Sequence, residues 1–196
     1  MTDKVQQGKI FTTMGANNHS KRKRADKDYY ATDPIAIDRL LMGAALSNNL
    51  WECACGDGSL SKRLEEKGYN VYSTDLYDWG YGETGIDFLK CEEIKKGTDI
   101  ITNPPYILAQ DFIEKALDIL PEGQKAFFFL KILFLESKKR RKLYEKGHFK
   151  HLYVCSERIA CAKDGDFEKH KNDKAIAFGW YEFEKGYKGQ PTISWI

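Results

Sequence analysis

The 196-residue sequence lacks the long apolar segments of membrane and secreted proteins. No stretch approaches the run of about 18 apolar residues that a membrane helix needs, and the longest apolar run, around 126–135, is interrupted by Lys131. Residues 1–28 are polar and lack the apolar core of a secretory signal peptide. We therefore expect no association with a membrane and a cytoplasmic location.

The sequence also lacks the cysteine and histidine spacings of metal sites. The five cysteines include no C-x-x-C pair, and their odd number without a secretory signal indicates a reducing, intracellular setting. The four histidines show no metal or catalytic spacing. The acids of residues 163–173 lack the closing glutamate of a calcium loop, so we interpret that segment as a mobile loop. No metal is expected.

A strong net charge is absent as well, because the formal charge is only +2. Basic residues gather in two runs, 21–24 and 138–142, which are interpreted first as solvated charge and alternatively as phosphate contacts. Residues 1–27 are polar and basic with little to bury, so we expect a flexible arm, with nucleic-acid binding as the alternative. Residues 28–196 are expected to form one domain.

Strand and helix patterns alternate along the first two thirds of the chain. Apolar runs at 50–55, 69–75, 98–103 and from 125 onward predict strands, and the patterns at 59–68 and 107–120 predict helices between them. Two closing strands, 148–156 and 175–184, have no helix between them and suggest an antiparallel edge. The alternation predicts an α/β fold with a parallel sheet covered by helices, whose ligands bind beyond the carboxyl ends of the strands.

The first strand runs into the sequence "WECACGDGSL", a glycine turn followed by a helix. Gly56 and Gly58 let backbone approach a ligand closely, and the helix start offers free N–H groups. The third glycine of a dinucleotide-binding loop is missing, and Glu52 and Asp57 add negative charge. A cation-bearing nucleoside or zwitterion therefore fits better than a pyrophosphate, and a purely structural tight turn is the alternative.

Two aspartates follow at positions suited to a nucleoside. Asp75 ends the second strand 19 residues after Gly56, the spacing at which an acid accepts hydrogen bonds from ribose hydroxyls. Asp87 can accept from an adenine amine while its apolar neighbour Phe88 covers the base. An ordinary helix cap is the alternative for Asp87.

The most specific feature is Asn103-Pro104-Pro105-Tyr106, directly after the third strand. The Asn103 side-chain oxygen and the Pro104 carbonyl can both accept hydrogen bonds from one exocyclic amine, which favours a more tetrahedral nitrogen with its lone pair free to attack. Pro105 fixes the turn. Tyr106 offers a ring on which a planar base can stack, worth about 1–3 kcal/mol. A helix start capped by asparagine is the alternative.

Taken together, "YYATDP", "ECACGDG", "TD", "DFL" and "NPPY" in this order resemble the class I S-adenosylmethionine-dependent amino-methyltransferases, especially the N6-adenine DNA methyltransferases. The resemblance covers about residues 28–160, and the position of "YYATDP" is similar to the gamma arrangement of small phage-type members. It implies a Rossmann-like, mostly parallel seven-stranded sheet with helices on both faces. It also implies S-adenosylmethionine as cofactor, with S-adenosylhomocysteine as product.

The resemblance assigns residues to two sites. For the cofactor it implies that Tyr30 and Thr32 form an N-terminal box that closes over it, and that Asp75 holds the ribose. Asp87 and Phe88 would hold the adenine. The methionine pocket would be shaped by Glu52, Ala54, Gly56 and Gly58, with Asn103 adjoining. For the target amine and base it implies Asn103, Pro104, Pro105 and Tyr106. Beside these, Phe167 is a candidate for stacking behind the base, with an ordinary surface or core position as the alternative. Arg158 and Lys131 are candidates for phosphate contact or, equally, charges at the rim of the site.

The implied reaction is direct transfer of a methyl group to the N6 amine of adenine in DNA, with the base flipped out of the duplex. The resemblance also implies that the protein works in the cytoplasm of a bacterial or phage-infected cell. The absence of a Pro-Cys nucleophile disfavours cytosine C5 methylation. About forty residues after Leu152 are too few for a target-recognition domain, so loops, the basic arm, a protein partner or a second copy would supply specificity. Methylation of guanine N2 in RNA or of protein glutamine, and a non-catalytic binding module, are the alternatives.

Overall fold

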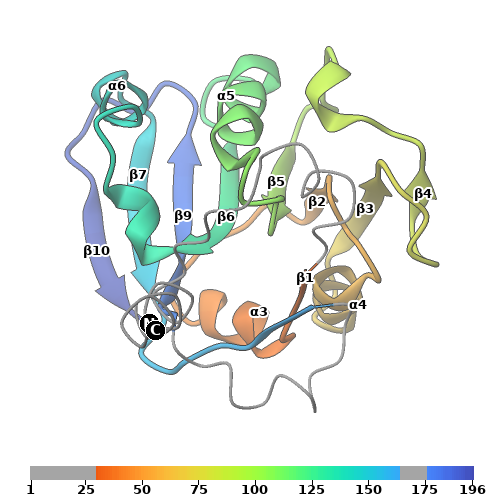
Figure 1. The fold of residues 1–196 in the computed structure, drawn as a ribbon. Helices are drawn as coiled ribbons and strands as arrows, with labels where there is room; N and C mark the ends of the chain where they lie inside the picture. Colours follow the sequence, from red (N-terminus) through yellow and green to blue (C-terminus); the bar gives the residue numbers. More distant parts are fainter. Residues whose placement is uncertain (1–29, 164–175) are drawn as a thin grey trace, which may run out of the picture.

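The computed structural model describes residues 30–163 and 176–196. The predicted basic arm 1–27, Phe167 and nearly all of the predicted loop 163–173 lie outside the described residues. The described part of the chain folds into one eight-stranded sheet, a separate two-stranded ribbon and helices on both faces of the sheet (Figure 1). Among the described residues, no helix is long and apolar enough to cross a membrane, and no three potential metal-ligating side chains gather.

The large sheet has the strand order β10-β7-β9-β6-β5-β2-β3-β4. Its strands are β2 (Asn49–Glu52), β3 (Asn70–Asp75), β4 (Glu83–Thr84), β5 (Thr98–Thr102), β6 (Lys125–Lys131), β7 (Phe149–Val154), β9 (Phe178–Glu184) and β10 (Thr192–Trp195). All neighbours are parallel except at β9, which is antiparallel to both β6 and β7. The predicted mostly parallel α/β sheet is therefore confirmed.

Two details of the sheet differ from the expectation. It has eight strands rather than seven, and two of them, β4 beside β3 and β10 beside β7, fall outside the strand ranges predicted from the sequence. The antiparallel strand β9 lies between β6 and β7 instead of at the edge, and it forms long ladders with both. A strand buried on both sides in this way suits the apolar sequence "FGWYEFE" of β9.

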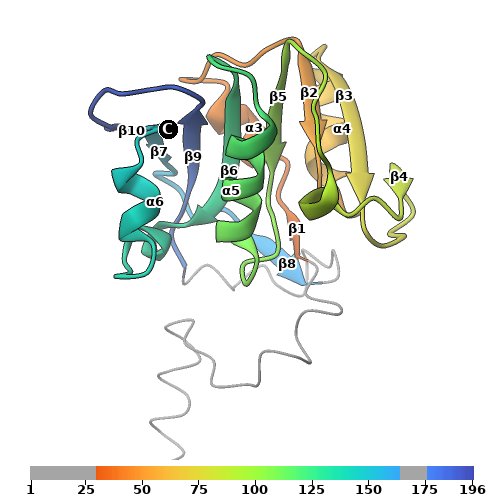
Figure 2. The same ribbon diagram turned by 90° about the horizontal axis from the view of Figure 1, so that it is seen from above.

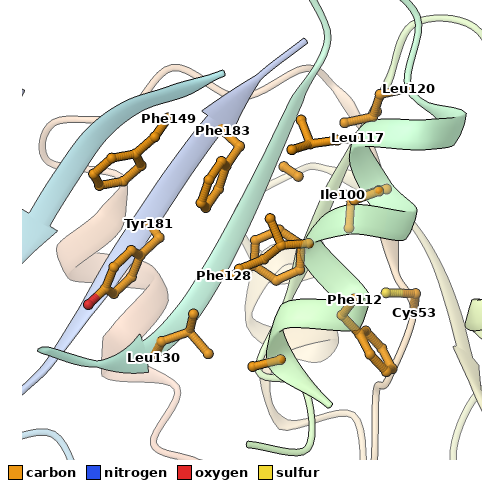
Figure 3. Close-up of a cluster of buried hydrophobic side chains, with 14 of the residues drawn as sticks. Cys53, Ile100, Phe112, Leu117, Leu120, Phe128, Leu130, Phe149, Tyr181 and Phe183 are labelled. Atoms are coloured by element: carbon orange, nitrogen blue, oxygen red, sulfur yellow. The ribbon is translucent and has the colours of Figure 1, made fainter. Parts of the chain in front are cut away.

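The helices cover the sheet in two layers. On one face, α3 (Ile35–Leu40) and α4 (Ser59–Glu66) pack on Leu50, Phe127 and Phe129. On the other face, α5 (Ala109–Ile119), α6 (Arg141–Glu145) and the short helices η1 (Phe88–Lys90) and η2 (Ile132–Leu135) lie against the cluster around Phe128 (Figures 2 and 3). The alternation of Phe127, Phe128 and Phe129 along β6 therefore supplies both cores.

The two-stranded ribbon joins β1 (Tyr30–Thr32) and β8 (Cys161–Lys163) in antiparallel pairing, with Thr32 opposite Cys161. The ribbon lies beyond the end of the large sheet to which β3 points (Figure 2). Asp33 follows β1, and its side chain accepts from the Ile35 N–H at 3.0 Å, at the start of α3. The ribbon thus brings Tyr30–Thr32, the described start of the chain, to the carboxyl ends of the parallel strands.

Candidate active site

Asp75 joins the ends of the first two strands of the predicted site. Its Oδ2 accepts from the Gly56 N–H at 3.0 Å, and its Oδ1 accepts from the Tyr77 N–H at 2.9 Å. The carboxylate is buried and faces a cavity of about 210 Å³ beyond the strand ends. Because each carboxylate oxygen can accept more than one hydrogen bond, Asp75 holds the turn and retains the capacity to bind a hydroxyl group.

The cavity is walled by the ends of β2, β3 and β5 and by the start of α5. Most of the predicted residues meet there, namely Tyr30, Ala54, Asp75, Asp87, Phe88, Asn103, Pro104, Pro105 and Tyr106. The sequence interpretation missed the apolar wall formed by Leu76, Tyr77, Trp79, Ile86, Leu89 and Leu108. Leu76 and Tyr77 follow Asp75 directly, so their position after a predicted ligand at a strand end was the available signal. They are exposed despite their size, at 46% and 42%.

Asp87 and Phe88 have structural partners in addition to their place on the cavity wall. Asp87 caps η1 by accepting from the Leu89 N–H at 3.1 Å, and it forms an ion pair with Lys90 at 3.1 Å. The Phe88 ring is buried and packs edge-on against Trp51 and beside Phe112, at centroid distances of 5.3 and 5.0 Å. The two roles that the sequence left open for Asp87, cap and cavity residue, are therefore compatible.

The glycine turn is shaped by Tyr81. Gly58 has a left-handed φ of 78°, and a Cβ atom on it would lie only 2.3 Å from Cδ1 of Tyr81. Neither Gly56 nor Gly58 lines the 210 Å³ cavity, so at Gly58 the missing side chain makes room for a tyrosine ring. Asp57 then starts α4 by accepting from the Ser59 N–H at 3.0 Å.

Glu52 lies at the end of β2 with its carboxyl group fully removed from water. The Ser61 hydroxyl donates to it, and Ser61 and Ser73 share a hydrogen bond of 2.7 Å. Burial raises the pKa of Glu52 to about 8 against the opposing effect of the Ser61 hydrogen bond. Glu52 also lines a small cavity together with Thr32 and Asn103, which places a proton-holding carboxyl beside the ribbon.

The Asn103 amide is oriented by the β1–β8 ribbon. Its Nδ2 donates to Thr32 Oγ1 at 2.7 Å and lies 3.5 Å from the Tyr30 carbonyl oxygen. Its Oδ1 is buried and has no hydrogen-bond partner. A buried acceptor without a donor costs about 1–3 kcal/mol, so this oxygen is suited to a donor supplied by a ligand. Pro105 completes the turn by accepting from the Leu108 N–H at 2.9 Å.

Tyr106 is surrounded by other rings and a cation. Its ring centroid lies 6.0 Å from that of Tyr30 and 6.2 Å from that of Phe178, and the Lys131 ammonium lies 4.6 Å from it. Burial raises the pKa of the Tyr106 hydroxyl well above its ordinary value. Lys131, predicted as a possible phosphate contact, thus lies over the ring predicted to hold a base.

The second basic run has local partners away from this cavity. The Arg140 guanidinium donates to the carbonyls of Phe134 and Glu136, both at 2.7 Å, and Arg141 pairs with Glu145 at 2.5 Å. The run leads into α6, which lies beside β7 and β10 at one edge of the sheet, whereas β1 lies near β5 and β2 (Figure 2). These contacts support the interpretation of residues 138–142 as surface and structural charge.

Neither a family model nor a curated protein sequence matches the chain. Solved structures do match, but their sequence identities to this chain are so low that the matches establish only the fold. A Listeria monocytogenes protein provisionally described as a class I S-adenosylmethionine-dependent methyltransferase aligns over 83% of this chain and 62% of its own, with a TM-score of 0.54 and 14% identity. A modification subunit provisionally assigned to a type I restriction enzyme of Vibrio vulnificus aligns over 96% and 51%, with a TM-score of 0.58 and 12% identity.

A third match is a Lactococcus lactis protein provisionally described as a hemolysin, which aligns over 82% of this chain and 91% of its own, with a TM-score of 0.59 and 11% identity. The chain therefore spans less than two thirds of the Listeria and Vibrio proteins and most of the Lactococcus protein. The described residues have the Rossmann-like fold of the class I S-adenosylmethionine-dependent methyltransferases.

Proposed function

We propose that the protein transfers a methyl group from S-adenosylmethionine to the exocyclic N6 amine of adenine in DNA. The observation that carries the proposal is the Asn103 amide, whose buried Oδ1 lacks a donor and whose side chain lines the cavity at the strand ends. An aromatic amine supplies two N–H donors in one plane. Asn103 Oδ1 and the Pro104 carbonyl would accept from them and draw the nitrogen lone pair out of conjugation with the ring.

The residues around the cavity suit the proposed cofactor. Asp75 presents a buried carboxylate at the position expected for ribose hydroxyls, and the half-buried side chain of Asp87, beside the buried ring of Phe88, is at the position expected for the adenine amine. Exposed apolar side chains, Leu76 and Tyr77, offer a surface to cover a purine ring. When bound, S-adenosylmethionine supplies the electrophilic methyl group on its sulfonium. The protein contributes position and hydrogen bonding, and no covalent intermediate is required.

The choice of DNA as the substrate draws on the resemblance and on the surroundings of Tyr106. The Tyr106 ring lines the same cavity as Asn103, so a base held by one would lie near the other. The Lys131 ammonium lies 4.6 Å from the Tyr106 ring centroid, and a cation beside the proposed base site would attract a polyanion. A duplex substrate would have to flip its adenine out at a cost of a few kcal/mol.

The proposal is tested by methyl transfer from labelled S-adenosylmethionine to DNA, RNA and protein acceptors assayed side by side, with cofactor binding followed by calorimetry. Wild-type protein should label adenine in DNA. Asn103→Ala should lower the transfer rate at least about 100-fold, because the acceptor of the target amine is lost, and should leave cofactor affinity nearly unchanged. Asn49→Ala, an exposed amide at the opposite end of β2, is the matched control and should retain wild-type rates.

Each alternative has its own signature in these assays. If labelled methyl groups appear only in RNA or protein, the proposed acceptor is wrong and the proposed transfer chemistry still holds. Failure to bind S-adenosylmethionine would favour a non-catalytic binding module. Undiminished transfer by Asn103→Ala would remove Asn103 from the reaction.

A further inference from the structure

The orientation of the Asn103 amide is decided by its contacts with β1. A side-chain amide has two ends of nearly equal size, one a donor and one an acceptor. The Tyr30 carbonyl, 3.5 Å from Nδ2, can only accept, so the nitrogen is the end that belongs against the ribbon. Thr32 Oγ1 accepts from the same nitrogen at the shorter distance of 2.7 Å. Oδ1 is then left buried without a donor.

The position of the Thr32 hydroxyl is fixed by the fold. Thr32 is 2% exposed, it pairs with Cys161 across the ribbon, and the next residue, Asp33, donates its N–H to the Ala160 carbonyl at 3.1 Å. Backbone pairing at Thr32 and at the next residue therefore fixes the position from which the Thr32 side chain projects. The resemblance places Thr32 at the cofactor, whereas its hydroxyl oxygen accepts a hydrogen bond from Asn103, the residue proposed to meet the target amine.

We propose that Thr32 is a positioning residue, whose hydroxyl holds the Asn103 amide with Oδ1 toward the target amine. The inference rests on the proposed function and deepens it. Without the Thr32 acceptor, only the longer contact with the Tyr30 carbonyl, at 3.5 Å, favours this orientation, so the amide turns over more often and presents its own N–H groups to the amine, donor facing donor. The fraction of molecules with a competent acceptor then falls, and the rate falls with it, while the cofactor contacts stay in place.

The test compares Thr32→Val, which keeps the shape and removes the hydroxyl, with Thr32→Ser, which keeps the hydroxyl. Thr32→Val should lower kcat about 10-fold, the loss expected for one neutral hydrogen bond. It should leave the Kd for S-adenosylmethionine within about twofold, and Thr32→Ser should recover most of kcat. Thr98→Val changes another buried threonine, at the opposite end of β5 from Asn103, and should leave kcat unchanged.

A second pair keeps the test valid if Thr32→Val fails to fold. Thr32→Ser and Thr32→Ala differ by the hydroxyl alone, so the ratio of their kcat values reports the same hydrogen bond. A rise of 10-fold or more in the Kd for S-adenosylmethionine with unchanged kcat would make Thr32 a cofactor ligand and overturn the inference. Equal kcat for the serine and alanine variants would overturn it as well.

Failure of the proposed function is distinguishable from failure of this inference. If the wild type methylates RNA or protein, the same variants are assayed on that acceptor. If it methylates nothing, NMR of the Asn103 side-chain amide, assigned with Asn103→Asp, still reports the contact. Loss of the threonine hydroxyl should then speed hydrogen exchange of the Nδ2 protons at least about fivefold, and unchanged exchange would refute the inference.

Discussion

The Glu52 carboxyl group illustrates how a single residue can be sequestered by this fold. It is surrounded by the end of β2, by Ser61 of α4 and, beyond Ser61, by Ser73 of β3, and it is completely buried. Removing a carboxyl from water disfavours its charged form, and the negative charges of Asp57 and Asp75 act in the same direction. The neutral acid is therefore the form present in the native protein at neutral pH.

This burial predicts a pH dependence of stability that Glu52→Gln should remove. The pKa of Glu52 rises from 4.5 to about 8 on folding, so the native state binds one proton more than the unfolded state between these values. The stabilisation is complete below pH 4.5 and is lost as the pH rises toward 8. The free energy of unfolding of wild type, relative to Glu52→Gln, should therefore fall by up to about 1.4 kcal/mol per pH unit in this range.

Chemical denaturation of both proteins at several pH values from 5 to 8 measures this difference, since the contributions of most other groups cancel. A difference that stays constant across the range would mean that Glu52 is ionised in the native protein. The prediction concerns the fold alone and does not depend on the proposed function.

At the scale of residues, the sequence identified which side chains meet at the cavity but not how they are oriented there. Asp75, Asp87 and Asn103 were predictable because each follows a recognisable strand or loop, at the ends where such sheets bind ligands. The direction of the Asn103 amide depends on Thr32, which lies 71 positions away in the sequence. Local patterns hold no information about partners at that distance, so the acceptor could be named and its orientation could not.

The turn from β2 into α4 gives a prediction at the scale of one element. Gly58→Ala forces a left-handed φ on alanine and drives its Cβ into the ring of Tyr81, 2.3 Å away. We expect a loss of at least about 2 kcal/mol in the free energy of unfolding. Gly68→Ala is the matched control, because Gly68 is also left-handed, with φ of 91°, and has no atom within 4 Å of the added Cβ. It should cost about 1 kcal/mol.

Denaturant unfolding of the two variants separates backbone strain from the clash with Tyr81. In Gly58→Ala combined with Tyr81→Ala, the cost should be smaller than the sum of the two single changes, since the clashing ring has been removed. Equal costs for Gly58→Ala and Gly68→Ala would show that the ring yields freely and that the turn does not depend on it.

At this scale the prediction from sequence succeeded for long elements and failed for short ones. The buried run of β6 and the helical pattern of α5 were both recognised near their observed bounds. The ribbon strands β1 and β8 have three residues each and pair Ala31 with Ala162, so neither offers enough residues for a periodic pattern. The placement of β9 between β6 and β7 was likewise beyond reach, because strand order depends on which pairings bury the most apolar surface.

For the molecule as a whole, the sheet divides the interior into two cores that differ in their relation to the site. Phe128 of β6 faces the cluster beneath α5, with Ile100 and Phe183 around it (Figure 3). Phe129 faces the opposite cluster and stacks on Phe178, with centroids 5.1 Å apart and planes inclined by 11°. Phe178 in turn contacts the Tyr106 ring of the candidate site. A chain of rings therefore leads from one core to Tyr106.

Phe128→Leu and Phe129→Leu form a matched pair that tests this chain of rings. Both side chains are fully buried in adjacent positions of one strand, so each change should lower the free energy of unfolding by about 1–3 kcal/mol. Only Phe129→Leu removes the ring that stacks on Phe178, and so weakens the packing of Phe178 against Tyr106. It should raise the KM for the acceptor several-fold at a temperature where both variants are folded, whereas Phe128→Leu should leave that KM unchanged. Equal KM values for the two variants would show that Tyr106 is held by its own turn at Pro104 and Pro105, independently of the core beneath it.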